Sequence, residues 1–159
     1  MTLTPKNSGW IEVICGSMFS GKTEELIRRV RRAEIAKMNT IIFKPNIDNR
    51  YSSNHIVSHN QSKMKSIVIN DINEIIDLSK QMDVIGIDEA QFFSIDLVNI
   101  SKKLARDNKR VLVAGLDTDF RGKPFGPMPA LMCEADYLDK LRAICVKCGN
   151  PASFSQRLI

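Results

Sequence analysis

Short runs of branched apolar residues alternate along the chain with longer segments in which apolar positions recur every three or four residues. The short runs predict β-strands at residues 10–15, 40–44, 66–69, 84–87 and 110–115. The longer segments predict amphipathic helices, the first over residues 23–38, the second after a cap at Asp71 and the third after Asp96. Strands that alternate with helices in this way predict an α/β fold.

Two of the predicted strands, residues 84–87 and 111–114, are apolar on both faces. This pattern is typical of parallel strands covered by helices on each side, so both strands should lie centrally in the sheet. Residues 45–65 and 117–129 show neither period and are rich in polar residues or in proline and glycine. We expect both segments to be loops, which at this length usually serve a function.

The composition fits one ordinary globular domain: 159 residues, 43% apolar, 26% charged, with a net charge of +5. It excludes a disordered chain. We see no secretory signal and no run of ~18 apolar residues, which predicts a cytoplasmic protein without a membrane partner. The arginines within residues 28–32 are expected to form a solvated helix face, and Cys15 and Cys133 are expected to be buried.

The junction of the first strand and the first helix carries the pattern Gly-x-x-x-x-Gly-Lys-Thr of a phosphate-binding loop. Glycines let such a loop turn tightly, so that backbone N–H groups converge on phosphate oxygens at the positive end of the helix. Lys22 is expected to reach the β and γ phosphates of ATP, and the Thr23 hydroxyl to bind Mg²⁺. The predicted nucleotide-binding residues are Gly16, Ser17, Met18, Phe19, Ser20, Gly21, Lys22, Thr23, Asp88 and Gln91.

An acidic pair, Asp88 and Glu89, follows the buried strand at residues 84–87. Ligands bind at the carboxyl ends of parallel strands, so Asp88 is predicted to hold Mg²⁺ together with Thr23. Glu89 can accept a proton from an attacking hydroxyl, or in an ATPase activate water. Four aromatic residues near strand ends either stack on a flat base or anchor the core: Phe92, Phe93, Phe120 and Phe125.

Together these motifs resemble the type II thymidine kinase family over residues 10–159. The resemblance is carried by segments 16–23, 88–93, 116–117 with Phe120, 123–126 and 145–148. It implies a RecA-like P-loop sheet with helices on both faces, in a cytoplasmic enzyme of pyrimidine salvage. Such an enzyme transfers the γ-phosphoryl group of ATP to the 5′ hydroxyl of thymidine or deoxyuridine with magnesium. The resemblance also implies a homotetramer, feedback by thymidine triphosphate, and no nucleic-acid partner.

The resemblance assigns further roles that the residues alone do not. Glu89 matches the base that takes the 5′ hydroxyl proton. Arg50 matches a residue that stabilises charge on the transferring group, a role that suits its fork of donors, and Asp48 is its neighbour near the substrate. The pocket around thymine is implied to consist of Met18, Phe92, Leu116, Phe120 and Phe125.

The resemblance divides the chain into a polar tail over residues 1–9, a kinase domain over 10–138 and the beginning of a zinc-ribbon-like element over 139–159. Family chains usually continue past residues 156–157 into a loop that closes over the nucleoside and a second pair of zinc ligands, so we expect this element to be incomplete at Ile159. Cys145 and Cys148 then supply two of the four ligands of a structural zinc site. A redox role is disfavoured because the pair opens a turn.

Two other functions compete with a kinase. The acidic motif also resembles that of helicase-type ATPases, but such motors generally need two RecA-like units, and one domain uses nearly all of this chain. A nucleotide-binding module without chemistry would keep the phosphate loop but would not need Glu89.

Overall fold

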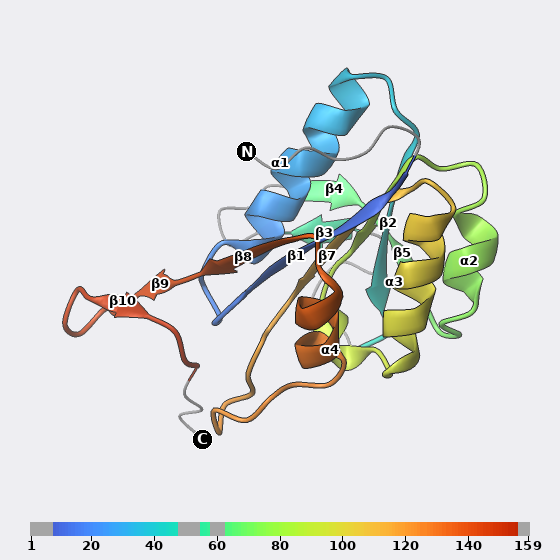
Figure 1. The fold of residues 1–159 in the computed structure, drawn as a ribbon. Coiled ribbons are helices and arrows are strands. Elements are labelled where there is room, and N and C mark those ends of the chain that lie inside the picture. Colours follow the sequence, from blue (N-terminus) through green and yellow to red (C-terminus); the bar gives the residue numbers. More distant parts are fainter. Residues whose placement is uncertain (1–7, 48–54, 58–62, 156–159) are drawn as a thin grey trace.

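The computed structural model describes residues 8–47, 55–57 and 63–155 (Figure 1). In chain order the elements are β1 (Trp10–Gly16), α1 (Lys22–Ile35), β2 (Thr40–Pro45), β3 (His55–Val57), β4 (Lys63–Lys65), β5 (Ile67–Ile69), α2 (Glu74–Leu78), β6 (Val84–Ile87), the 3₁₀ turn η1 (Ala90–Phe92), α3 (Asp96–Arg106), β7 (Arg110–Gly115), α4 (Met128–Glu134), β8 (Tyr137–Leu141), β9 (Ala143–Ile144) and β10 (Pro151–Ala152). None of the described helices is long and apolar enough to cross a membrane.

Six strands form one parallel sheet in the order β5-β2-β6-β7-β1-β8. Helix α1 covers one face, and α2, α3 and α4 cover the other (Figure 1). The α/β prediction with helices on both faces is therefore confirmed. Because β7 lies between β6 and β1, the carboxyl ends of these three strands meet at one edge of the sheet.

Each face of the sheet has its own apolar core. Beneath α1, Leu26 and Val30 pack on Ile14 and Leu112, and all four side chains are buried. The larger core joins the other face of the sheet to α2, α3 and α4. The central strands β6 and β7 contribute to both cores, as their two-sided apolar pattern predicts.

Several boundaries differ from the predicted ones. Helix α1 ends at Ile35 because Lys37 takes the left-handed conformation (φ 63°), and the N–H of Met38 donates to the carbonyl of Ala33 at 3.0 Å. The predicted cap at Asp71 is wrong, since α2 begins at Glu74.

The two predicted loops also contain regular structure. Residues 55–57 and 63–65 pair as antiparallel strands β3 and β4 within the first of them. Helix α4 begins at Met128 within the second, where the polar and proline-rich surroundings hide its period. Cys15 is buried as predicted, but Cys133 on α4 is exposed, which corrects its prediction.

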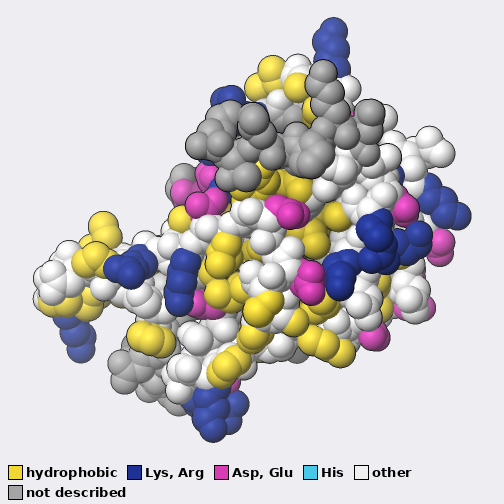
Figure 2. All heavy atoms as spheres, in the orientation of Figure 1, with side chains coloured by type: hydrophobic (Ala, Val, Ile, Leu, Met, Phe, Trp, Pro, Cys, Tyr) yellow, Lys and Arg dark blue, Asp and Glu magenta, His cyan; other side chains and the backbone are white. Residues whose placement is uncertain are grey.

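Strand β8 lies at the edge of the sheet and was not predicted, because its three central residues are exposed and two of them, Asp139 and Lys140, are charged. It pairs with β1 up to Leu141, so the main sheet extends past residue 138. Strands β9 and β10 follow as an antiparallel hairpin that projects from the body (Figure 1). In Figure 2 this arm carries hydrophobic and basic side chains, and Ile144 and Val146 are exposed on it.

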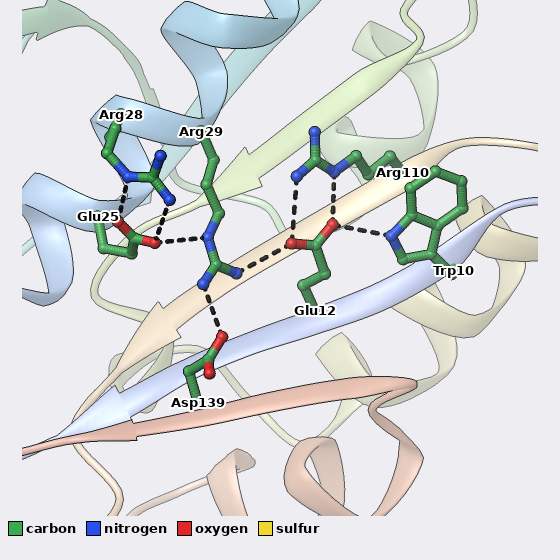
Figure 3. Close-up of polar contacts among 7 residues, drawn as sticks. All are labelled: Trp10, Glu12, Glu25, Arg28, Arg29, Arg110 and Asp139. Atoms are coloured by element: carbon green, nitrogen blue, oxygen red, sulfur yellow. Dashed lines mark hydrogen bonds and ion pairs between the residues drawn. The ribbon is translucent and has the colours of Figure 1, made fainter. Parts of the chain in front are cut away.

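An ion-pair network joins α1 to three strands on its face of the sheet (Figure 3). Arg29 donates to Glu25 of its own helix, to Glu12 of β1 at 2.9 Å and to Asp139 of β8 at 2.7 Å. Arg110 of β7 also binds Glu12, whose side chain is only 9% exposed. The network fixes the helix that follows the phosphate loop against β1, β7 and β8.

Arg29 therefore departs from the predicted solvated face. Its side chain is 12% exposed, whereas Arg28, Arg31 and Arg32 are exposed as expected. The difference arises because Arg29 lies on the side of the helix that faces the edge of the sheet.

Candidate active site

The phosphate loop connects β1 to α1 and needs glycine at both ends. A side chain at Gly16 (φ 142°) would place its Cβ 2.2 Å from the carbonyl oxygen of Leu141 in β8. Gly21 takes the left-handed conformation (φ 89°) at the N-cap of α1, where no side chain caps the helix. The first N–H groups of α1 are thus left to a ligand, as a phosphate site requires.

Inside the loop, hydrogen bonds converge on the carbonyl oxygen of Ser17. It accepts from Lys22 Nζ at 2.6 Å and from Ser20 Oγ at 2.7 Å. Phe19 at the top of the loop is exposed and has a positive φ of 61°. Burial lowers the pKa of Lys22, whereas the nearby carboxylates, Glu89 foremost, act in the opposite direction.

The carboxylate of Asp88 faces the start of α1. Thr23 Oγ1 lies 3.3 Å and 3.4 Å from its two oxygens. Burial, together with the charge of Glu89, raises the pKa of Asp88 to about 7. A hydroxyl and a carboxylate at this spacing are oxygen donors of the kind that Mg²⁺ prefers, so these two predicted ligands fit the ion.

Glu89 and Gln91 form a second polar unit beside Asp88. Glu89 takes the left-handed backbone conformation (φ 53°), which turns the chain into η1. Gln91 Nε2 donates to Glu89 Oε2 at 2.9 Å, and Gln91 Oε1 accepts from the N–H of Leu116 at 3.0 Å. The sequence predicts Gln91 among the nucleotide-binding residues, whereas the structure joins its amide to Glu89 and to the end of β7.

Several residues predicted to line the thymine pocket follow Gln91 in the sequence or lie on the loop after β7. Phe92 and Phe125 meet edge to face with ring centroids 5.4 Å apart. Leu116 is half-buried, and Phe120 is exposed on the turn after β7, with the Arg121 guanidinium 5.7 Å from its ring centre.

The segment that contains Ala152 and Ser155 contacts the phosphate loop. The N–H of Met18 donates to Ser155 Oγ at 3.0 Å, and Ser17 Oγ donates to the carbonyl of Ala152 at 3.2 Å. Met18, a predicted pocket residue, is thereby tied to a segment far away in the sequence. Asp48 and Arg50 lie outside the described residues.

Three charged residues at the site were given no role by sequence reasoning. Asp117 follows Leu116 and is buried, with one oxygen 2.9 Å from Lys140 Nζ and the other without a hydrogen-bond partner in the described part of the chain. Lys44 follows Phe43, which pairs with Ile87, so it lies beside Asp88. The position of Asp117 at a strand's carboxyl end could have revealed it, but Lys140 lies on a strand that was not predicted.

Cys145 and Cys148 lie in the turn between β9 and β10. Hydrogen bonds from the N–H groups of Cys148 and Lys147 lower the pKa of the Cys145 thiol. Across residues 8–47, 55–57 and 63–155, no group of three or more His, Cys, Asp or Glu side chains could hold a metal ion. Among these residues the two thiols offer only half of a tetrahedral zinc site.

Three comparisons relate the chain to known proteins. The family model described as thymidine kinase matches residues 9–159. The chain is 55% identical over 150 residues to a thymidine kinase of Rhodothermus sp. (strain ITI 518), covering 94% of this chain and 70% of that protein. Among solved structures, the genome packaging NTPase B204 of Sulfolobus turreted icosahedral virus 2 is similar with a TM-score of 0.49 and 17% identity, over 82% of this chain and 72% of that one. This chain belongs to the thymidine kinase family.

Proposed function

We propose that this chain is an ATP-dependent thymidine kinase, which transfers the γ-phosphoryl group of ATP to the 5′ hydroxyl of thymidine or deoxyuridine. The observation that carries the proposal is the meeting of the phosphate loop and the acidic pair: Thr23 lies 3.3 Å from Asp88, and Glu89 follows directly. A phosphate site beside Glu89, a candidate general base, supports phosphoryl transfer. Membership of the thymidine kinase family indicates that thymidine accepts the phosphoryl group.

In the proposed reaction the 5′ oxygen of the nucleoside bonds to the γ phosphorus while the bond to the bridging oxygen breaks and ADP leaves. Glu89 takes the proton of the 5′ hydroxyl. Lys22 leaves Ser17 for the β and γ phosphates. Thr23 and Asp88 would hold Mg²⁺, which when bound neutralises charge on the phosphate oxygens.

Arg50 is proposed to stabilise charge on the transferring group, with Asp48 beside it at the substrate. The thymine ring would lie among the pocket residues Met18, Phe92, Leu116, Phe120 and Phe125. The edge-to-face pair of Phe92 and Phe125 supports this proposal, because it brings together two aromatic rings against which a flat thymine ring can pack, and Phe92 follows Glu89 closely in the sequence.

Family membership leads us to propose further properties. We expect a cytoplasmic homotetramer in pyrimidine salvage, with feedback by thymidine triphosphate and without nucleic acid as a partner. Structural zinc also stays a prediction, for which Cys145 and Cys148 supply two thiols. Light scattering and metal analysis of the purified protein test the tetramer and the zinc.

Product analysis tests the proposed function. The protein is incubated with ATP, Mg²⁺ and thymidine, and nucleotides are separated by chromatography. We expect thymidine monophosphate and ADP in equal amounts. Phosphate release that depends on added DNA or RNA would identify a motor instead, and neither product would identify a binding module.

A further inference from the structure

Gln91 lies between the candidate base and the end of β7. Its side-chain amide donates to Glu89 Oε2 at 2.9 Å and accepts from the N–H of Leu116 at 3.0 Å. A carboxylate can only accept and a backbone N–H can only donate, so a single orientation of the amide satisfies both partners. Gln91 is 4% exposed, which leaves its side chain little surface for contact with a ligand.

Two glycines leave room for Gln91. A Cβ at Gly115 would lie 2.8 Å from Gln91 Oε1 and 2.9 Å from the sulfur of Met128. A Cβ at Gly126, which has a positive φ of 53°, would lie 2.4 Å from the backbone oxygen of Gln91. Backbone segments from the end of β7 and from the turn before α4 therefore pack directly against this residue and restrict its movement.

Glu89 benefits from this support because its own backbone is in an uncommon state. A non-glycine residue with a φ of 53° is rare, and such conformations persist where the surroundings hold them. The amide of Gln91 fixes the carboxylate of Glu89 from two residues further along the chain. The same amide ties it to Leu116, a residue of the proposed thymine pocket.

We propose that Gln91 is a positioning residue: it holds the Glu89 carboxylate in register with the nucleoside pocket, without touching ATP or thymidine itself. This inference rests on the proposed function, in which Glu89 accepts the 5′ hydroxyl proton. Misplacing reacting groups by about 1 Å can cost on the order of 10² in rate, so the position of the base matters as much as its presence.

Steady-state kinetics of Gln91→Met test the proposal, because methionine keeps the length of the side chain and removes both hydrogen bonds. We expect kcat to fall about tenfold to a hundredfold while the KM for ATP stays within about twofold. Gln81→Met, at an exposed position before β6, is the matched control and should keep wild-type kinetics. An unchanged kcat in a folded Gln91→Met protein, or a loss that appears only in the KM for ATP, overturns the proposal.

A double-mutant cycle with Glu89→Gln separates positioning from a general structural effect. If Gln91 acts through the base, Gln91→Met should lower kcat no further once Glu89 is replaced. The same loss in both backgrounds contradicts the proposal.

Gln91→Glu covers the case in which Gln91→Met does not fold. The glutamate keeps the acceptor for the Leu116 N–H. Because two neighbouring carboxyls share a proton at moderate pH, kcat is measured at about pH 9, where both are ionised and no donor to Glu89 remains. We expect the same tenfold to hundredfold loss of kcat, and wild-type kcat overturns the proposal. If the wild type and Gln81→Met both form no thymidine monophosphate, the proposed function itself has failed, and the positioning role fails with it.

Discussion

Lys22 Nζ lies 2.6 Å from the carbonyl oxygen of Ser17, within its own phosphate loop. The ammonium group thus has a partner before any nucleotide is present, and phosphate oxygens must replace that carbonyl when ATP binds.

Replacement of Lys22 by alanine should abolish most phosphoryl transfer and leave the fold intact. Loss of a preorganised charge that stabilises the transition state costs roughly 10² to 10³ in kcat. Lys103→Ala, an exposed lysine on α3, serves as the control. Turnover and thermal unfolding are measured for both variants. Wild-type turnover in Lys22→Ala would show that Lys22 does not stabilise the phosphates during transfer.

Glu89→Gln should lower turnover by roughly 10² to 10⁴, the usual contribution of a positioned base. The amide keeps the size of the side chain, so titration calorimetry should find ATP and thymidine binding preserved. A loss of less than about fivefold would mean that positioning alone accounts for the catalysis.

Asp88→Asn should alter how stability depends on pH in the metal-free protein. The pKa of Asp88 rises from 3.8 to about 7 in the folded state, so the carboxyl favours folding while protonated. That contribution is present below pH 3.8 and is lost as the pH rises through about 7, by at most about 4 kcal/mol.

We therefore expect the stability of Asp88→Asn relative to the wild type to be greater at about pH 8 than at about pH 5. Denaturant unfolding of both proteins in the presence of a chelator measures the two differences. Equal differences at the two pH values would contradict the raised pKa of Asp88.

Arg29→Met should destabilise the fold, whereas Arg28→Met should not. Loss of Arg29 leaves the nearly buried Glu12 with fewer cationic partners, which we expect to cost about 1 to 3 kcal/mol in the free energy of unfolding. Arg28 makes an exposed ion pair with Glu25, a kind that contributes little to the free energy of unfolding because solvent screens it. Equal losses in the free energy of unfolding for the two substitutions would show that the network of Figure 3 does not stabilise the fold more than an exposed ion pair does.

Hydrophobic pattern and motif spacing sufficed for the central sheet and the phosphate loop. Strand β6 matches its predicted bounds, because a run that is apolar on both faces has few other ways to be buried. The glycines of the phosphate-loop motif were likewise predicted to let the loop turn tightly, and Gly16 and Gly21 both have positive φ.

Other features depend on contacts that no local pattern records. Strand β8 is an exposed edge strand with two charged residues at its centre, recognisable through its pairing with β1. Arg29 differs from its exposed neighbours only through Glu12 and Asp139 on distant strands. The place of Gln91 between Glu89 and Leu116 likewise requires that β6 and β7 be neighbours in the sheet.

The order of strands bears on how the chain folds during its synthesis. Among the described strands β1 is made first, yet its partners there are β7 and β8, which begin at Arg110 and Tyr137. Strands β2, β5 and β6 can pair with one another earlier, because all three precede α3. The strand that leads into the phosphate loop therefore stays without these sheet partners until β7 has been synthesised. Such late long-range pairing slows folding and leaves apolar surface exposed in the meantime.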